Sequence, residues 1–482
     1  MRSARAAARS PAGRCAERRG AVWSWYLFDW ATQPFFTLIV TFLYGPYFAT
    51  AIAANEVEGQ ALWGYAAAAA GALVAVFAPL LGAVADRSGR RKPWMLAFSV
   101  LFCVGCYGLW FGMPGAGDAV LLVLASYVIA TVGAEFATVF TNAMMPDLAP
   151  GSRLGRLSGT GAAVGYVGGL VSLVLVLAFV DADPAIGLTR AGVPPLFGLI
   201  PAAGSTAATG PLSAVWYVVF VVPLFLMIPD RPTRRPAGAG LRDGLGALVA
   251  TLKDAARRRP LILYLIANVF IRDGIAALGA FGGIYAAGVL GWGQSELGVF
   301  GIVLIVTAAF GAWGGGRLDD RIGPLAVIAA ALVGLIVCAL TILSLDRDVV
   351  LFAVAVAPPA AGASPFTSLP SQLMLLVGAL LGLFFGPILA AGRSLLVALS
   401  PPDRITAVFG LYAFTGKVTS FLAPLSVAIL TDAFDSQRWG AAIIPAFLVA
   451  GLMLLLRVRR AAATERLAAA AAPRAAAPQA GV

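Results

Sequence analysis

Residues 82–93 read GAVADRSGRRKP and lie between two long apolar runs. Their charged side chains would each cost several kcal/mol inside hydrocarbon, so we expect a short loop on the charged, cytoplasmic side of a membrane. The pattern returns at residues 316–324, GRLDDRIGP, in the form Gly-x-x-x-Asp-Arg-x-Gly. Two copies in register, 234 residues apart in a chain of 482, predict a duplicated helical bundle. The corresponding positions are Gly82 and Gly316, Asp86 and Asp320, Arg87 and Arg321, and Gly89 and Gly323.

This motif resembles the loop between the second and third helices of the major facilitator superfamily of transporters, which recurs between the eighth and ninth. The resemblance implies an all-α membrane protein of twelve transmembrane helices, arranged as two pseudo-symmetric halves of six with a substrate path between them. An ordinary positively charged loop is the alternative reading, and the duplication argues against it. We therefore expect a cytoplasmic gate at Gly82, Asp86, Arg87, Gly89, Arg90, Gly316, Asp320, Arg321 and Gly323.

The composition excludes several classes of function. With 60% hydrophobic and 12% charged residues, the chain lies outside the range of soluble globular proteins. The net charge of +11 is concentrated in stretches that we expect on one side of the membrane, so it indicates orientation and not a nucleic-acid partner. The sequence has no histidine, which removes His-based metal sites and Ser-His-Asp hydrolysis. No Walker or nucleophile-elbow motif is present, so we expect no enzyme activity, no metal and no cofactor.

Hydropathy divides the chain into five parts. We expect a cytoplasmic leader at 1–22, a six-helix bundle at 23–228, a cytoplasmic linker at 229–259, a second six-helix bundle at 260–459 and a disordered cytoplasmic tail at 460–482. The eleventh span is expected at 407–431. The excess of cations in the leader, linker and tail predicts an integral protein of the bacterial inner membrane with both termini in the cytoplasm.

A second internal correspondence supports the duplication. Residues 150–165 match residues 401–416 at a constant separation of 251, through Pro150, Arg153, Gly159 and Gly165 and their counterparts Pro401, Arg404, Gly410 and Gly416. The separation grows because the outer loop predicted at 346–372 is longer than its counterpart at 113–118. In the fifth span, three glycines at intervals of four predict a ridge for close helix packing: Gly161, Gly165 and Gly169.

Six charged residues fall within apolar spans: Asp29, Glu135, Arg272, Asp273, Arg393 and Lys417. Each would cost about 2.5–3.5 kcal/mol if it faced lipid, so we expect them to face an interior cavity and to find partners. Structural pairing between helices is the alternative for any one of them. The first, fourth, seventh and tenth spans line the cavity of the major facilitator fold, and the resemblance therefore implies a substrate site at these six residues and at Gln33, with Lys417 leaning in from the eleventh span.

Four stretches resemble the vacuole-effluxer-like (autophagy-related) branch of this superfamily. They are FDWATQPFF at 28–36, FTNAMMPDLAP at 140–150, NVFIRDGIAALGAFGGIYA at 268–286 and SPPDRITAVFGLYAFTGKVTSFLAPL at 400–425. Fungal members are linked with export of amino acids from the vacuole, which implies an amino-acid-like substrate. The Gly-x-x-x-Gly-Pro signature of proton-driven drug exporters is incomplete, since Tyr166 stands where proline would follow Gly165.

We therefore expect a secondary active transporter that moves a small polar, zwitterionic solute by alternating access, coupled to protons and acting as a monomer in the bilayer. A multidrug or lipid-like exporter and a non-transporting scaffold or sensor are the alternatives. Without histidine, a coupled proton must bind a carboxylate, and the candidates are Asp29, Glu135 and Asp273. Asp29 has no cation in its own span, so we expect it to be the proton-sensitive group, with Glu135 second.

Overall fold

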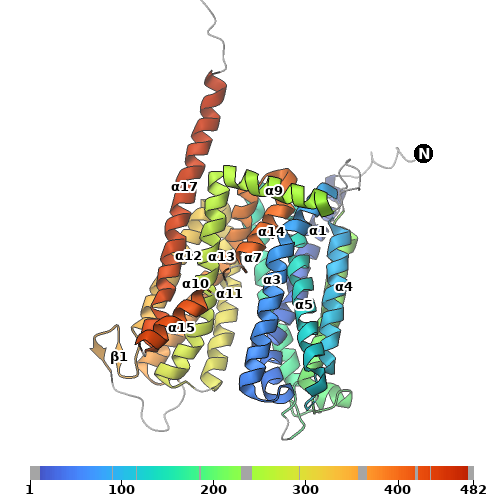
Figure 1. Cartoon of the computed structure of the whole chain (residues 1–482), viewed down its shortest axis with the longest axis vertical. Coiled ribbons are helices and arrows are strands. Elements are labelled where there is room, and N and C mark those ends of the chain that lie inside the picture. Colours follow the sequence, from blue (N-terminus) through green and yellow to red (C-terminus); the bar gives the residue numbers. More distant parts are fainter. Residues whose placement is uncertain are drawn as a thin grey trace, which may run out of the picture.

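The computed structural model describes residues 11–88, 91–115, 117–183, 186–229, 241–292, 294–356, 366–417, 419, 422–434 and 436–475. The chain forms an elongated bundle of roughly parallel helices in two halves (Figure 1). The first half contains α1 (Pro11–Pro34), η2 (Phe35–Phe42), α2 (Tyr44–Tyr47), η3 (Phe48–Ile52), α3 (Glu56–Ser88), α4 (Lys92–Gly108), η4 (Leu109–Phe111), η5 (Gly117–Ala119), α5 (Val120–Asn142), α6 (Met145–Leu148), η6 (Gly151–Arg153), α7 (Leu154–Phe179), η7 (Pro195–Gly198), η8 (Ser205–Ala208) and α8 (Thr209–Met227).

The second half follows a connecting helix, α9 (Leu241–Arg257). It contains α10 (Arg259–Leu290), α11 (Gln294–Ile322), α12 (Pro324–Leu343), α13 (Leu369–Leu399), η9 (Pro402–Arg404), α14 (Ile405–Thr415), α15 (Leu422–Phe434), α16 (Gln437–Ala441) and α17 (Ile443–Ala475). Between α12 and α13 the loop forms a small antiparallel hairpin of β1 (Val349–Val350) and β2 (Val354–Ala355).

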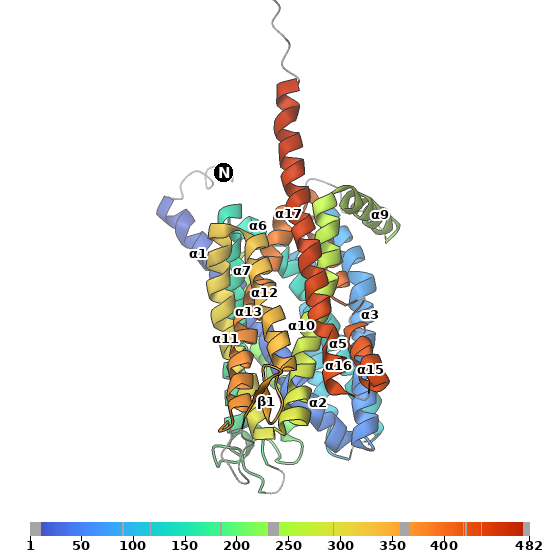
Figure 2. The ribbon, with the colours of Figure 1, turned by 90° about the vertical axis from the view of Figure 1, so that its left-hand side faces the viewer.

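The two ends of the bundle differ. Helix α9 lies across one end, and α17 projects beyond the bundle at that same end, as both views show (Figures 1 and 2). We call this the linker end. The β1–β2 hairpin lies at the opposite end (Figure 2). The two copies of the charged motif lie at the C-terminal ends of α3 and α11, which are at the linker end. The positive charge of the linker predicts the same side of the membrane for both copies.

Among the described residues, ten helices are long and apolar enough to cross a membrane. The first predicted span consists of two helical pieces, Arg19–Phe42 and Tyr44–Ile52, bent by 42°. Pro34 and the π-helical turns of η2 interrupt the regular hydrogen-bond ladder there, which accounts for the irregular path. The predicted eleventh span is divided, because α14 ends at Thr415 and α15 begins at Leu422.

Helical structure extends across two of the predicted boundaries. The leader at 1–22 is helical from Pro11, as part of α1. The tail, expected to be disordered from residue 460, continues as α17 to Ala475, while residues 476–482 lie outside the described part. The tail is rich in alanine, the residue with the highest helix propensity, and its attachment to a transmembrane helix removes the need for a new nucleus.

The glycine ridge on α7 positions the first span. A methyl group on Gly161 would come within 2.6 Å of the Trp25 ring, and one on Gly165 within 3.2 Å of Cβ of Asp29. Helices α1 and α7 therefore approach closely along this ridge. Trp25 is buried and its Nε1 donates to the carbonyl of Thr141 on α5 at 2.9 Å, which fixes the rotation of α1. Asp29 and Gln33 consequently face the space between the two halves.

Candidate functional site

At the linker end, two equivalent pairs of helices join the halves: α3 with α14, and α7 with α11. Gly82 on α3 lies against the backbone of Thr406 and Ala407, and a methyl group there would come within 2.6 Å of the Thr406 carbonyl oxygen. Gly410 on α14 lies equally close to the backbone of Ala78. The absence of a side chain is what lets the two backbones touch.

The second pair repeats this arrangement through the duplicated residues. Gly316 on α11 lies against the backbone of Gly155 and Gly159, and Gly159 lies against the carbonyl of Ala312. Each of these positions is the counterpart of one in the first pair, at the separations of 234 and 251 residues found in the sequence. The internal repeat therefore extends to the contacts between the halves.

The two aspartates of the doubled motif cap helices of the opposite half. Asp86 accepts hydrogen bonds from the backbone N–H groups of Thr406 at 3.1 Å and Ala407 at 2.7 Å, in the first turn of α14. Asp320 accepts from the backbone N–H of Arg156 at 3.1 Å, in the first turn of α7, and lies 3.4 Å from its Nε. A helix N-terminus carries unpaired N–H groups and partial positive charge, so each carboxylate stabilises the contact.

Other members of the predicted gate are placed differently. Arg321 is exposed at the end of α11, and no hydrogen bond or ion pair joins it to another described residue. Gly323 adopts a positive φ of 85° and starts α12, so its role is the turn. Gly89 and Arg90 lie outside the described residues, as does the side chain of Arg87.

Sequence reasoning missed two further residues that join the halves at the linker end. Arg91 donates from Nε to Thr406 Oγ1 at 3.2 Å and pairs with Asp147 at 3.0 Å. Asp319 is 5% exposed, lies against Gly155 of the other half, and accepts a hydrogen bond from Ser394. The available signal was the extra carboxylate in GRLDDRIG, where the first copy of the motif has Ala85.

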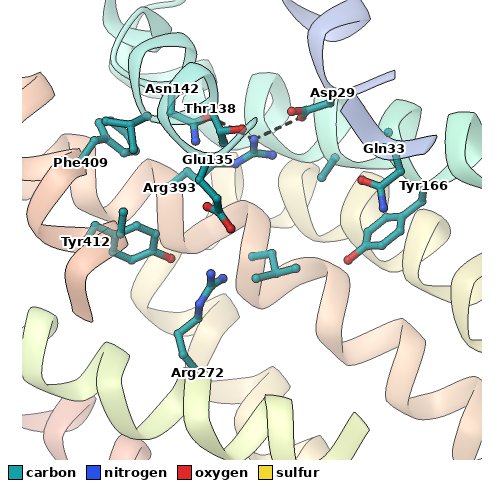
Figure 3. Close-up of a pocket in the computed structure, with 15 residues that line it drawn as sticks. Asp29, Gln33, Glu135, Thr138, Asn142, Tyr166, Arg272, Arg393, Phe409 and Tyr412 are labelled. Carbon is teal, nitrogen blue, oxygen red and sulfur yellow. Dashed lines mark hydrogen bonds and ion pairs between the residues drawn. The ribbon is translucent and has the colours of Figure 1, made fainter. Parts of the chain in front are cut away.

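A cavity of about 300 Å³ lies between the halves (Figure 3). Helices α1, α5 and α7 line it from the first half, and α10, α13 and α14 from the second. Five of the seven predicted substrate residues are on its wall, namely Asp29, Gln33, Glu135, Arg272 and Arg393. The remaining lining residues are Thr138, Val139, Asn142, Ala162, Gly165, Tyr166, Leu389, Phe409, Tyr412 and Ala413.

Arg393 on α13 connects its half to three helices of the other. Its Nη1 lies 3.2 Å from Asp29 Oδ2 on α1 and 3.3 Å from Asn142 Oδ1 on α5. Its Nε and Nη2 donate to the hydroxyl and carbonyl of Ser158 on α7 at 2.9 Å and 2.8 Å. The planar guanidinium thus uses its fixed fork of donors to hold one position between the halves.

Lys417 makes the second ion pair across the cavity. It lies in the turn between α14 and α15, and its Nζ is 2.9 Å from Glu135 Oε1 on α5. The prediction that Lys417 could lean inwards from the eleventh span therefore matches its position. The interrupted helix explains how, because a turn gives the side chain a direction that a continuous helix would not.

The charges of the cavity are segregated by half. Both carboxylates, Asp29 and Glu135, belong to the first half, and the three cations, Arg272, Arg393 and Lys417, belong to the second. Two cations are paired across the cavity. Arg272 points towards Glu135 but forms no hydrogen bond or ion pair with the described residues (Figure 3). The cavity therefore offers one uncommitted guanidinium.

The expectation that Asp273 lines the cavity is wrong. It is 2% exposed and is absent from the cavity wall, although its neighbour Arg272 is on it. Successive helix residues point about 100° apart, so only one of the two can face the cavity. The side chain of Asp273 instead lies near Thr419, beyond the end of α14.

Several cavity residues were not predicted as site residues, although the sequence contained signals for some. Asn142 and Tyr412 belong to stretches singled out for their family resemblance, and Tyr166 marks the departure from the drug-exporter signature. Ser158 accepts two hydrogen bonds from Arg393. Nothing in the sequence predicted this role, because a serine in a glycine-rich span is common.

Comparison with known sequences gives these features a context. A family described as "Vacuole effluxer Atg22 like" matches residues 48–467. The "Uncharacterized MFS-type transporter YxiO" of Bacillus subtilis is 25% identical over 451 residues, covering 92% of this chain and 95% of that protein. "Autophagy-related protein 22" of Cryptococcus neoformans is 27% identical over 329 residues, covering 63% of this chain and 52% of that protein. The match thus spans about half of the fungal relative.

Solved structures share the fold. The major facilitator transporter FucP in its outward conformation has a TM-score of 0.65 at 14% identity, covering 91% of this chain and 98% of that one. The proton:xylose symporter XylE has a TM-score of 0.65 at 13% identity, covering 92% and 94%. The predicted all-α major facilitator fold and the predicted branch are confirmed.

We predict that Asp86→Asn loosens the linker end. A neutral amide replaces a carboxylate whose hydrogen bonds are worth about 1.5–3 kcal/mol each, against about 1 kcal/mol for neutral ones. In a variant without native cysteines, a cysteine at Ala78, buried where α3 meets α14, should then react with a maleimide about tenfold faster, since 1.4 kcal/mol corresponds to a factor of ten. The control is Asp403→Asn, an exposed carboxylate near the start of α14, which should change nothing. Unchanged labelling in a folded Asp86→Asn protein would refute the gate.

We also predict strong coupling between Asp29 and Arg393. Arg393→Gln leaves Asp29 and Ser158 without their partner and should lower the free energy of unfolding by about 3 kcal/mol. Asp29→Asn should cost less, because Arg393 keeps its contacts with Ser158 and Asn142. The double variant should be more stable than the sum of the single losses predicts. Unfolding of the purified proteins measures this, and strict additivity would show that the ion pair contributes nothing.

Proposed function

Because the chain belongs to the vacuole effluxer Atg22-like family of major facilitator transporters, we propose that it is a secondary active transporter of a small zwitterionic, amino-acid-like solute. The observation that carries this proposal is the segregation of charge, with carboxylates on one wall of the cavity and cations on the other. A cavity of about 300 Å³ suits a small solute.

The charge pattern orients such a substrate. Its carboxylate would bind Arg272, whose guanidinium is uncommitted and can form a bidentate pair. Its ammonium would bind on the opposite wall, at Glu135 or Asp29. Three cations face two carboxylates, so the substrate's carboxylate meets a site with one unbalanced positive charge.

The same groups suggest how binding drives alternating access. Asp29–Arg393 and Glu135–Lys417 both join one half to the other, so each must break when the halves separate on that side. A substrate ammonium that competes for Glu135 releases Lys417, and a substrate carboxylate offers the released cation a new partner. The substrate thereby replaces a contact between the halves with contacts to itself, which lowers the barrier to rearrangement.

Proton coupling is proposed at Asp29, with Glu135 second. Asp29 cannot hold a proton and pair with Arg393 at once, and Arg393 belongs to the half that moves away when the linker end opens. Protonation of Asp29 would therefore accompany that opening. The cation that faces Asp29 comes from α13 and not from the span of Asp29 itself.

The location and assembly are proposed in line with the charge distribution. The excess of cations in the leader, linker and tail supports insertion in a bacterial cytoplasmic membrane with both termini inside. One chain supplies both walls of the cavity, which supports a monomer as the functional unit.

An amphiphilic, lipid-like substrate is the second candidate, and one observation favours it. An apolar groove of about 380 Å³ lies between α7 and α11, lined by Val167, Leu170, Val306 and Phe310 among others, and Tyr166 lines both this groove and the polar cavity. Phe310 is 66% exposed, so the groove opens towards lipid. A molecule with a polar head and an apolar chain could occupy both spaces at once.

We predict that free amino acids stabilise the purified protein against thermal unfolding, because a ligand that binds only the folded state raises its stability. Their N-acetylated and amidated derivatives, which lack the ammonium or carboxylate charge, should have no effect at equal concentration. Arg272→Gln should abolish stabilisation by amino acids, whereas the control Arg321→Gln, at an exposed position, should not. Stabilisation by single-chain amphiphiles alone would instead support the second candidate.

We predict that Asp29→Asn abolishes substrate uptake driven by a proton gradient in reconstituted vesicles and leaves counterflow exchange measurable. The amide cannot take up a proton, but it can still contact Arg393, so the exchange pathway survives. Loss of both activities would assign Asp29 to substrate binding. Survival of gradient-driven uptake would remove it from the coupling mechanism.

A further inference from the structure

The eleventh span is interrupted in the middle of the bundle. Helix α14 ends at Thr415, α15 begins at Leu422, and Gly416, Lys417 and Thr419 lie in turns between them. Inside a membrane, non-helical backbone is tolerated where protein surrounds it or a cavity borders it. Interrupted helices in transporters commonly mark ion and substrate sites. On one side of this interruption, Lys417 forms an ion pair with Glu135.

A buried carboxylate occupies the other side. Asp273 on α10 is 2% exposed and lies near the hydroxyl of Thr419. Among the described residues, neither Asp273 Oδ2 nor Thr419 Oγ1 has a hydrogen-bond partner. A threonine hydroxyl can hydrogen-bond to a carboxyl group in either protonation state, so the main cost at this depth is the charge of an ionised Asp273.

We propose that Asp273 and Thr419 form a proton-binding site at the interruption of the eleventh span. A proton on Asp273 Oδ2 turns that oxygen into a donor that faces an acceptor, Thr419 Oγ1. The proton removes the buried charge of Asp273, which forms no ion pair with the described residues. The site is distinct from the cavity, whose carboxylates are both paired with cations.

The surroundings of Asp273 hold few charges. Arg272 is the charged side chain close enough to act on it, and that guanidinium extends past Gly416 to the cavity. Helix α17 packs against the following residue, Gly274, with Phe447 and Leu448. Four charged groups on or beside elements that contact α10 have partners elsewhere, namely Arg393 in Asp29, Lys417 in Glu135, Arg438 in Asp346 and Arg404 in Asp254.

The site is connected to the cavity through the chain itself. Thr419 is two residues from Lys417, so a hydrogen bond from Asp273 would fix the turn that carries Lys417 towards Glu135. Loss of the proton would release the turn and weaken the Lys417–Glu135 contact between the halves. This connection rests on the proposed transport function, whereas the protonation of Asp273 does not.

Infrared spectroscopy tests protonation without any transport assay. The difference spectrum of wild type minus Asp273→Asn at neutral pH should contain a carbonyl-stretching band of a protonated carboxyl group. The same difference for the exposed control Asp403→Asn should lack it. Thr419→Val should shift the band to higher frequency, because the carboxyl group loses its acceptor, and this variant serves if Asp273→Asn fails to fold. If the difference spectrum of wild type minus Asp273→Asn contains the bands of an ionised carboxylate instead, the proposal is overturned.

Counterflow exchange, which needs no gradient, tests the connection to the cavity. Exchange of an amino acid by the wild type should slow as pH rises and Asp273 loses its proton, whereas Asp273→Asn should lose this part of the pH dependence and keep only the part that Asp29 contributes. A variant that keeps the wild-type pH profile would overturn the connection. If the wild type exchanges no amino acid at all, the proposed substrate is wrong, and the infrared result still decides the proton site.

Discussion

A charge inside a membrane protein must have a partner, and in this bundle the partners of the cavity charges are in opposite halves. Asp29 is paired with Arg393 and Glu135 with Lys417, so neither half is electrostatically complete alone. The contacts that make these charges tolerable are therefore also the contacts that hold the halves together. Any movement between the halves has to exchange one set of partners for another, and this requirement makes the cavity sensitive to a charged solute.

The duplication is accurate where the halves meet at the linker end and absent in the cavity. Asp86 and Asp320 cap equivalent helices, and the glycine contacts repeat at both helix pairs. In the cavity, by contrast, the first half supplies the carboxylates and the second supplies the cations. Under the proposed function this difference has a physical reason, since closure of the linker end repeats one contact twice, whereas a site for a solute with two unlike charged ends requires unlike walls.

The fold could be predicted from the sequence because its signals are local or repeated. Hydrophobic length located the spans, and the doubled GxxxDRxG motif located both halves and their joining aspartates. The directions in which individual side chains point were harder to predict. Arg272 and Asp273 are neighbours in sequence, and only the helix rotation decides which one reaches the cavity. The partners of Asp29 and Glu135 lie hundreds of residues away, and the turn that directs Lys417 leaves no hydropathy signal, so these pairs needed the three-dimensional structure.

The contact between the halves at the linker end is built mainly from main-chain atoms. Backbone atoms of the opposite half lie against four glycines, namely Gly82, Gly410, Gly159 and Gly316, and backbone N–H groups donate to Asp86. In each contact one residue must therefore keep its identity. Its partner contributes only the peptide unit, which all residues share. Neutral drift can therefore replace most side chains along these helices without disturbing closure. A chain that shares only about a quarter of its residues with this one, as the Bacillus subtilis relative does, would need to keep just these few positions to close in the same way.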